Sequence, residues 1–588
     1  MRYGRSFPDR LSKFLFYIDG YLLLLSIIAI FSFIIENGFE LNHTYRISLG
    51  AFHLLLGIIF VGDYFLKFLL AERKSHFIQR NPWYGIVTLL ILLNIITVFS
   101  LKIGFQHGEF DLSSLVRPKE VLWMTFRLLV FVVALSKLVR IVKVVQGLGV
   151  KPVQLLCFSF FMLIVTGMLL LMVPEATTHR IRLIDAAFMA TSATCVTGLA
   201  TKSVGNDFTT FGQLILLTLI QIGGLGIMTL TAFVAVITRR GFSLTSKKIV
   251  SEITEIFSAA QLLPLIKQIV GYTLAMEFIG ATILSVRWYQ EFHNWGKAIY
   301  FGIFHAISAF CNAGFGLLDS SLESYIKDPF ISLTIAFLIM GGSIGYLIVH
   351  DLFVYYRDWK HRHAKRLGVQ TRITIIITLI LLIGGTILIW IFEQPRTLAG
   401  YDPFTQWSAA FFQSVATRTA GFNTIHIPSL SQATLFIMIF LMFIGGSSGS
   451  TAGGIKTSTF GVLLAQVRAT MFGDSEVIIF ERTIPRSTIT KAISITLVST
   501  LLIFICLVIM LVTQPFPFLD SLFETISAFG TVGLSTGITP ELNPIGKITI
   551  MTLMYLGRVG PVSFFVALGE IAHRERVVTY PESYIMVG

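Results

Sequence analysis

The chain has 588 residues, of which 54% are hydrophobic and only 13% are charged, and its mean hydropathy is +0.78. A soluble protein carries roughly 25% charged residues, and many apolar runs here reach the roughly 17–25 residues that cross hydrocarbon, so a soluble fold is excluded. The formal net charge of +13 comes from basic residues at the ends of apolar runs. That placement follows the positive-inside rule and argues against nucleic acid as a partner.

Residues 1–150 predict an N-terminal four-helix transmembrane domain, with spans near 14–35, 48–70, 83–102 and 121–146. The first run is too long and too weakly terminated for a cleaved signal peptide, so we expect a retained span. Arg2, Arg5, Arg10 and Lys13 precede this span and predict a cytoplasmic N-terminus.

The fourth of these spans is unusually basic for a membrane helix. Arg127 lies within it, and Lys137, Arg140 and Lys143 follow at three-residue spacing, which aligns them along one stripe. Asp63 and Lys67 lie four residues apart in the second span. This layout resembles a voltage-sensor-like domain, although the third span lacks the acidic residue usual there. The alternative is a non-sensing bundle whose cations reach the cytoplasmic interface.

From residue 151 onward one short sequence motif occurs four times, as SATCVTGL (192–199), SAFCNAGF (308–315), VATRTAGF (415–422) and SAFGTVGL (527–534). The glycines Gly198, Gly314, Gly421 and Gly533 recur at intervals of 107 to 116 residues, which indicates one repeated structural unit. Each copy follows an apolar segment too short to cross a bilayer. We therefore predict four repeats, each an outward span, a short pore helix, a filter segment and an inward span, around one pseudo-fourfold pore.

The predicted repeats cover 151–260, 261–368, 369–487 and 488–588, the last including a cytoplasmic tail. Outward spans are expected near 153–173, 265–286, 372–392 and 492–512, and pore helices near 184–195, 299–312, 404–418 and 519–531. Inward spans are expected to begin near 211, 328, 432 and 546. The basic residues that follow the inward spans all fall on one side only if the pore segments re-enter without crossing.

The filter segments suit the binding of a dehydrated monovalent cation. Rings of backbone carbonyls replace the water shell of such an ion, and they require non-helical backbone that lines a pore. Pore helices that end before the filter also direct their negative ends toward the cation. The predicted potassium-binding residues are Val196, Thr197, Gly198, Asn312, Ala313, Gly314, Thr419, Ala420, Gly421, Thr531, Val532 and Gly533.

The third inward span contains a run of small residues, GGSSGSTAGG, at 445–454, followed by Lys456. Glycine costs a helix about 1 kcal/mol relative to alanine, so the run predicts a non-helical intramembrane loop below the filter. A close-packed helix is the alternative. Arg558 occupies a depth where the other repeats carry Gly224, Gly342 and Gly446, and there it would repel a cation or hold the loop through carbonyls.

Over residues 151–588 the chain resembles the Ktr/Trk/HKT superfamily of potassium transporters. The resemblance rests on the four filter motifs, on RTAGFNT (418–424), on the glycines beneath the filters and on Arg558. The resemblance implies potassium uptake at the cell inner membrane, a homodimer, and a cytoplasmic nucleotide-binding regulatory ring made by a separate protein. It implies a gate at 445–456, formed by Gly445, Gly446, Gly449, Gly453, Gly454 and Lys456 together with Arg558 as a barrier. In plant relatives a serine at a filter glycine accompanies sodium selectivity, so four glycines favour potassium.

Two rival functions stay open at this stage. One is a sodium-coupled potassium or sodium transporter of the same superfamily, and the other is a polytopic membrane enzyme. The repeats carry no convergent Asp, Glu or His, and no nucleotide-binding loop, so we expect no enzyme activity and no cofactor bound by this chain. His350, Asp351, His361 and His363 lie among basic residues, which disfavours a metal site. Arg418 is expected to face Glu524 or Asp520 behind the filter.

Overall fold

The structure is a computed structural model, and it describes residues 43–70, 85–94, 152–237, 262–360 and 367–561, with Lys74 and scattered positions between 21 and 32. These residues form helices almost throughout. Four of the described helices are long and apolar enough to cross a membrane, or five if a pair of helices bent by 90° is counted as one span. The predicted all-α, multi-pass fold is therefore confirmed.

The described part from residue 152 repeats one order of helices four times. The outward helices are α7 (Pro152–Leu171), α11 (Leu262–Phe292), α15 (Val369–Glu393) and α19 (Arg486–Thr513). The pore helices are α8 (Leu183–Cys195), α12 (Trp295–Phe310), α16 (Pro403–Ala416) and α20 (Phe518–Gly530). The inward helices are α9 (Thr210–Ile237), α13 (Pro329–Ile344), α17 (Gln432–Phe443) and α21 (Pro544–Val559).

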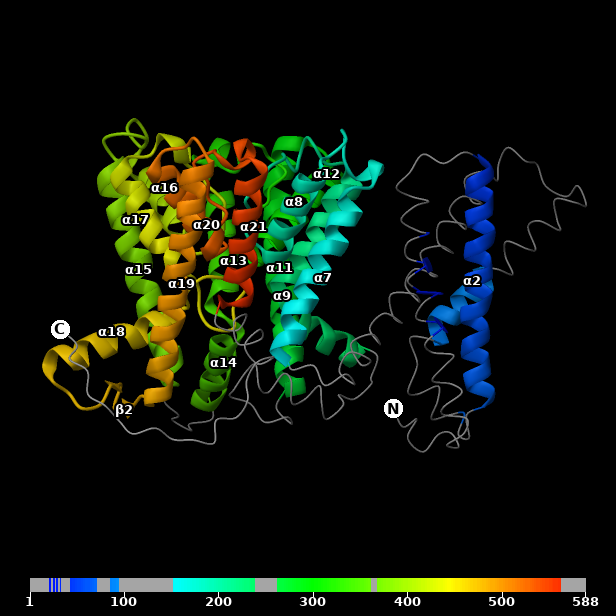
Figure 1. Ribbon diagram of the computed structural model, residues 1–588, viewed down its shortest axis with the longest axis horizontal. Helices are drawn as coiled ribbons and strands as arrows, with labels where there is room; N and C mark the ends of the chain where they lie inside the picture. The colour runs from blue at the N-terminus through cyan, green and yellow to red at the C-terminus, as the bar shows by residue number, and fades with distance from the viewer. Residues whose placement is uncertain are drawn as a thin grey trace, which may run out of the picture.

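Further elements connect these helices. Short 3-10 turns lie at one end of the repeats, at η2 (Pro174–Ala176), η3 (Glu323–Tyr325), η4 (Ile427–Ser429) and η5 (Thr539–Glu541). On the opposite side lie α14 (Tyr346–Lys360), α18 (Thr457–Phe472) and a small antiparallel hairpin, β1 (Ile478–Ile479) with β2 (Arg482–Thr483). Figure 1 shows the four pore helices in the upper half of the molecule, with α14 and α18 below.

Local sequence explains where the short helices begin. The side chains of Asn294, Asp402 and Asn543 accept hydrogen bonds from backbone N–H groups in the first turns of α12, α16 and α21, at 2.9–3.1 Å. Proline occupies the first helical position of α13, α16 and α21, where its missing N–H is not needed. These residues fix where α12, α13, α16 and α21 begin.

The four repeats close into a ring. Each pore helix packs against the inward helix of the preceding repeat, in the pairs α9 with α12, α13 with α16, α17 with α20, and α21 with α8. The last pair returns to the first repeat. Each pore helix also carries a phenylalanine with no exposed surface, namely Phe188, Phe304, Phe412 and Phe523.

Polar contacts join neighbouring repeats at the seam of α21 with α8 and at the seam of α9 with α12. At the seam of α21 with α8, Lys547 Nζ lies 2.6 Å from Asp185 Oδ1, and both side chains are largely buried. At the seam of α9 with α12, the Tyr300 hydroxyl donates to Gln213 Oε1 at 2.7 Å. The ion pair therefore holds together the two ends of the repeat series.

Replacing Lys547 with methionine is expected to destabilise the protein strongly, because it leaves the Asp185 carboxylate buried without its cation. Removing one partner of a buried ion pair costs about 3–5 kcal/mol. The melting temperature of the detergent-solubilised protein measures this loss. The double variant Lys547→Met/Asp185→Asn is expected to recover most of it, and a single variant as stable as wild type would contradict the role of the pair.

Glycines shape the inward helices at matching depths. A Cβ atom added to Gly223, Gly342 or Gly557 would overlap a backbone carbonyl at the end of the pore helix of the same repeat. These glycines therefore allow the inward helices to pack closely against the ends of the pore helices. The helices bend just beyond, at Gly226 (φ 74°) and at Gly345 (φ 87°), where α13 and α14 meet at 90°.

The N-terminal part is described only in segments. The helix α2 (His43–Leu69) contains the Asp63–Lys67 pair, whose charged atoms lie 2.6 Å apart. The predicted fourth span, with Arg127, Lys137, Arg140 and Lys143, lies outside the described residues, so the voltage-sensor-like domain and the non-sensing bundle both stay predictions.

Candidate functional site

The four filter segments share one unusual backbone. Two positions before each filter glycine, a residue other than glycine adopts the left-handed backbone conformation. Its φ is 57° at Val196, 60° at Asn312, 69° at Thr419 and 49° at Thr531. The glycines follow with φ between 69° and 99°. Such angles are rare for side-chain-bearing residues and mark functional sites. The pore helices thus end in the same non-helical turn four times.

These segments meet around one centre. A Cβ atom added to Gly198 would lie 2.5 Å from the carbonyl oxygen of Ala313, and one added to Gly314 would lie 2.9 Å from that of Ala420. The series continues from Gly421 to the Val532 oxygen at 2.8 Å.

The last contact closes the ring, because a Cβ atom on Gly533 would overlap the carbonyl oxygen of Thr197. Each filter glycine therefore faces the carbonyl that precedes the next filter glycine. No side chain fits between neighbouring segments, so backbone oxygens are the groups available to an ion there.

Hydrogen bonds hold three of the segments in the same way. The N–H groups of Thr197, Ala313 and Val532 each donate at 2.8 Å to the carbonyl of a serine near the end of the pore helix. In the third segment Val415 replaces this serine, and Ala420 N–H donates instead to Ala416 at 3.1 Å. The third filter segment is therefore held differently from the other three.

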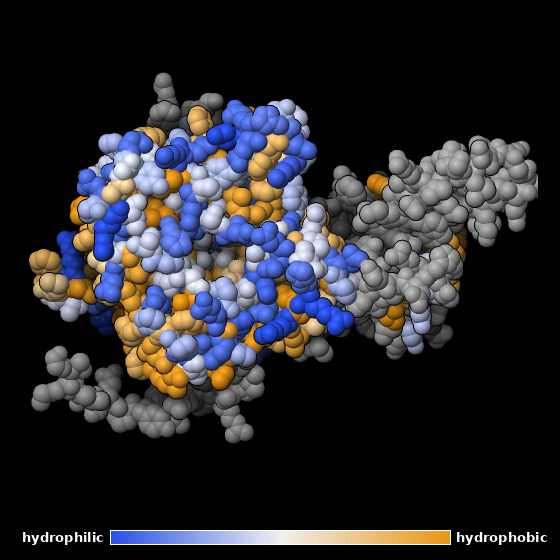
Figure 2. All heavy atoms as spheres, turned by 90° about the horizontal axis from the view of Figure 1, so that it is seen from above, coloured by the Kyte–Doolittle hydropathy of each residue, from blue (hydrophilic) through white to orange (hydrophobic). Residues whose placement is uncertain are grey.

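An open vestibule lies above the filter glycines, with a cavity volume of about 720 Å³. Its lining includes the carboxylates of Asp207, Asp319 and Glu323, together with the cation Lys202 and the imidazole of His426. Hydrophilic residues cover much of this face when it is seen from above (Figure 2). Three carboxylates against one lysine give this lining an excess of negative charge, which attracts cations.

Contacts between repeats shape the vestibule wall. Asp319 accepts hydrogen bonds from Ser203 and Asn206 of the first repeat. Glu323 accepts one from the Asn423 side chain at 2.7 Å, just past the third filter. These carboxylates fix the second repeat to both of its neighbours.

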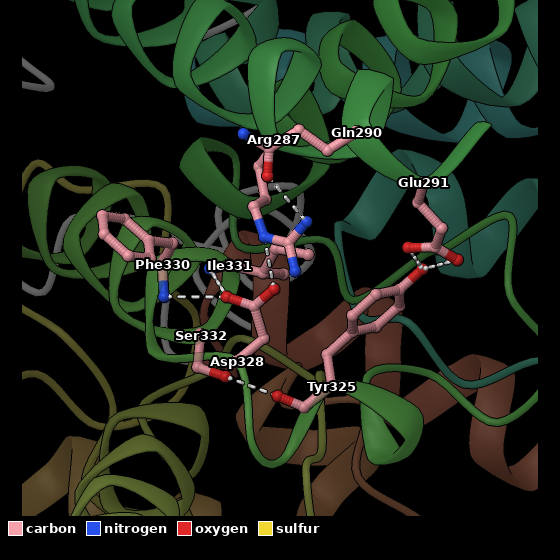
Figure 3. Close-up of polar contacts among 8 residues, drawn as sticks. All are labelled: Arg287, Gln290, Glu291, Tyr325, Asp328, Phe330, Ile331 and Ser332. Atoms are coloured by element: carbon pink, nitrogen blue, oxygen red, sulfur yellow. Dashed lines mark hydrogen bonds and ion pairs between the residues drawn. The ribbon is translucent and has the colours of Figure 1, made fainter. Parts of the chain in front are cut away.

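A polar cluster fixes the outer end of the second repeat (Figure 3). Arg287 Nε of α11 lies 2.7 Å from Asp328 Oδ2, and Asp328 caps the start of α13. The Tyr325 hydroxyl donates to Glu291 at 2.9 Å. The loop that carries Asp319 and Glu323 is thereby anchored to the outward helix.

The third inward segment is interrupted below the filter, as its glycines predicted. α17 ends at Phe443 and α18 begins at Thr457. The loop between them is closed at its base by Gly445 N–H donating to Ile455 at 2.9 Å. It also docks on the break between α13 and α14, where Tyr346 N–H donates to the Gly449 carbonyl at 3.0 Å. The loop is thus an ordered element held by backbone hydrogen bonds.

Arg558 joins this loop to the first repeat. Its guanidinium donates to the carbonyl of Thr451 in the loop and to those of Gly223 and Gly224 in α9. Lys456 Nζ donates to the Ala452 carbonyl at 2.5 Å within the loop. Both cations are held by backbone carbonyls, so the hydrogen-bonding alternative for Arg558 agrees with this geometry.

The expected pairing of Arg418 with Glu524 or Asp520 is wrong. Its guanidinium lies 3.4 Å from the Thr378 carbonyl in α15 and from the Gly445 carbonyl at the start of the 445–456 loop. Glu524 instead accepts a hydrogen bond from Thr539. The reason is that Arg418 follows the end of α16, and its side chain reaches α15, the outward helix of its own repeat.

The residues considered as metal ligands make hydrogen bonds within the protein where the chain is described. His350 Nδ1 lies 2.6 Å from Gln268 Oε1, and Asp351 accepts from Thr371 Oγ1 at 2.6 Å. No group of three or more His, Cys, Asp and Glu side chains in the described residues could hold a metal ion. His361 and His363 lie outside these residues.

Sequence reasoning missed the side-chain contacts between repeats. The Asp185–Lys547 pair and the Asp319 cluster join positions more than a hundred residues apart, and their chemistry gives no local pattern. Only the depth of an isolated lysine in an apolar helix could have drawn attention to Lys547.

Comparisons with known proteins agree with this architecture. The family profile described as TrkH, cation transport protein, matches residues 151–576. The chain is 38% identical over 448 residues to the Ktr system potassium uptake protein B of Bacillus subtilis (strain 168), covering 76% of this chain and 99% of that protein. It is also 38% identical over 446 residues to the potassium/sodium uptake protein NtpJ of Enterococcus hirae, covering 74% and 97%.

A solved structure has the same fold. The crystal structure of the potassium transporter TrkH from Vibrio parahaemolyticus superposes with a TM-score of 0.57 at 17% identity, covering 83% of this chain and 99% of that one.

Proposed function

The chain belongs to the TrkH family of cation transport proteins, and on that premise we propose that it takes up potassium through a gated filter lined by backbone carbonyls. Family membership makes it a multi-pass membrane transporter and not an enzyme. The observation that carries the proposal is the closed series of contacts from Gly198 through Gly314 and Gly421 to Gly533. Potassium is the substrate, and the protein needs no other bound group for this step.

We assign ion binding to the carbonyls of the residues that precede and include the filter glycines. Four segments with the same left-handed turn can offer successive rings of oxygens, which replace the hydration shell of the ion. The carboxylates Asp207, Asp319 and Glu323 attract the cation, and the ends of the pore helices favour it at the filter. The division of 151–588 into four repeats is part of this proposal.

The proposed gate consists of the 445–456 loop with Arg558. The loop lies next to the filter, since a Cβ atom added to Gly445 would be 3.5 Å from the Thr419 side chain. Opening the pore requires the loop to leave Arg558 and the break at Gly345. The energy for that movement must come from outside the pore, because the described contacts of the loop all favour the docked state.

We propose that partners supply this energy and that the protein is a homodimer in the cell inner membrane with a cytoplasmic N-terminus. Relatives are named as components of a Ktr system, which supports a membrane subunit working with other subunits. A nucleotide-binding ring on the cytoplasmic side is the partner we expect. The first 150 residues precede the part that the family profile matches, and their role as a sensor or a packing bundle is open to experiment.

Sodium coupling is a second candidate, because one relative is named a potassium/sodium uptake protein. Purified protein in proteoliposomes distinguishes the two. We expect potassium uptake that proceeds without sodium and exceeds sodium uptake under the same gradient. Potassium flux that vanishes when sodium is withdrawn would support the coupled transporter, and sodium flux equal to potassium flux would contradict the potassium filter.

A further inference from the structure

Asn312 breaks the symmetry of the filter. It occupies the left-handed position that Val196, Thr419 and Thr531 occupy in the other repeats, and it is the only amide among the four. Its side chain has no exposed surface. A buried amide requires hydrogen-bond partners, so its contacts indicate what this position does.

The Asn312 amide reaches across to the next repeat. With its oxygen facing the neighbouring hydroxyls, it accepts from Ser343 Oγ at 2.8 Å and from Thr419 Oγ1 at 3.2 Å. Its nitrogen then donates to the carbonyls of Ala309 at 3.1 Å and Ile339 at 3.2 Å. One side chain therefore connects the second filter segment to the third segment, to its own pore helix and to α13.

The backbone beside Ser343 also holds the 445–456 loop. The Ser447 N–H donates to the Ser343 carbonyl at 3.0 Å, and its hydroxyl donates to the Ile344 carbonyl. Thr451 N–H donates to the Gly342 carbonyl at 3.3 Å. Ser343 thus touches the filter through its side chain and the loop through its carbonyl.

We propose that the Asn312 side chain is a selectivity-determining positioning residue, which fixes the spacing of the second and third filter segments and links that spacing to the docked loop through Ser343. The inference rests on the proposed carbonyl filter. Asn312 acts here through its side chain, in addition to the carbonyl assigned to ion binding above. The chemical reason for the amide is that it can accept two hydroxyls and donate to two carbonyls at once, which valine and threonine cannot do.

The first test replaces Asn312 with valine, the residue that the first repeat carries at φ 57°. Losing hydrogen bonds of about 1–1.5 kcal/mol is expected to lower the potassium-to-sodium flux ratio in proteoliposomes about tenfold. Thr374→Val is the matched control, since it removes a buried hydroxyl that has no hydrogen-bond partner and lies away from the filter. An unchanged ratio in Asn312→Val would overturn the proposal.

Folding and the filter itself need separate checks. If Asn312→Val is not recovered as folded protein, Asn312→Thr replaces it, because threonine occupies the same turn at Thr419 and Thr531. Gly421→Ser serves as the reference for the filter. If Gly421→Ser lowers the ratio and neither Asn312 variant does, the inference about Asn312 fails; if Gly421→Ser also leaves the ratio unchanged, the filter assignment fails.

The link to the loop has its own readout. Ser343→Ala removes the hydroxyl that reaches Asn312, keeps the Ser343 carbonyl that accepts from the loop, and leaves every filter residue in place. We expect it to lower the potassium-to-sodium ratio as well as to change the total flux. A variant that changes the flux and keeps the ratio of wild type would overturn the coupling through Ser343.

Discussion

Replacing Gly533 with alanine is expected to remove most of the preference for potassium over sodium. The added Cβ would overlap the Thr197 carbonyl oxygen and lie 3.0 Å from the Gly198 Cα, so the first and fourth filter segments must separate. The left-handed backbone at φ 91° adds a strain of about 1–3 kcal/mol. A displaced carbonyl that loses even about 1.4 kcal/mol of differential binding lowers the selectivity tenfold. Paired potassium and sodium fluxes in proteoliposomes measure the change.

Gly400→Ala separates the two causes of this effect. Gly400 has the same φ of 91°, and no atom lies within 4 Å of the position of its Cβ. We expect this control to lower stability slightly and to retain the wild-type flux ratio. Equal ratios in Gly533→Ala and wild type would show that the Thr197 carbonyl does not contribute to selectivity.

Replacing Arg558 with alanine is expected to raise potassium flux in the absence of any regulatory partner. The guanidinium holds the Thr451 carbonyl of the loop and two carbonyls of α9, and each charge-assisted hydrogen bond contributes about 1.5–3 kcal/mol. Losing even one would shift the loop toward release by about tenfold or more. Flux equal to that of wild type would contradict a barrier at this position.

Arg558→Lys distinguishes how the barrier works. Lysine keeps the charge and loses the planar set of donors that spans the two repeats. Flux as low as in wild type would indicate repulsion of the cation by charge. Flux as high as in the alanine variant would indicate that the hydrogen bonds to the loop are the barrier.

The sequence predicted the helices well because their signals are local. Glycine spacing and the length of apolar runs predicted pore helices near 184–195 and 519–531, and the structure has them at Leu183–Cys195 and Phe518–Gly530. The loop at 445–456 was predictable for the same reason, since five glycines in ten residues disfavour a helix by their composition alone.

Contacts between repeats were not predictable from one sequence. The ring order, in which Gly533 meets Thr197, depends on how four separate turns pack around a centre. Arg418 illustrates the limit, because its expected carboxylate partner lies in another repeat while its actual partners are carbonyls of its own repeat. Asn312 was assigned to ion binding through its backbone carbonyl alone. Nothing in the neighbouring sequence indicates the hydroxyls that its side-chain amide reaches.

The measurement that tests the central claim most directly is the flux of potassium against sodium into proteoliposomes for wild type and Gly421→Ser. Gly421 has φ 76°, and a Cβ there would lie 2.8 Å from the Val532 carbonyl oxygen. The carbonyl filter predicts that wild type passes potassium well ahead of sodium and that the serine variant loses much of this preference. Flux that persists in Gly421→Ser with an unchanged ratio would contradict the assignment of these four segments as the filter.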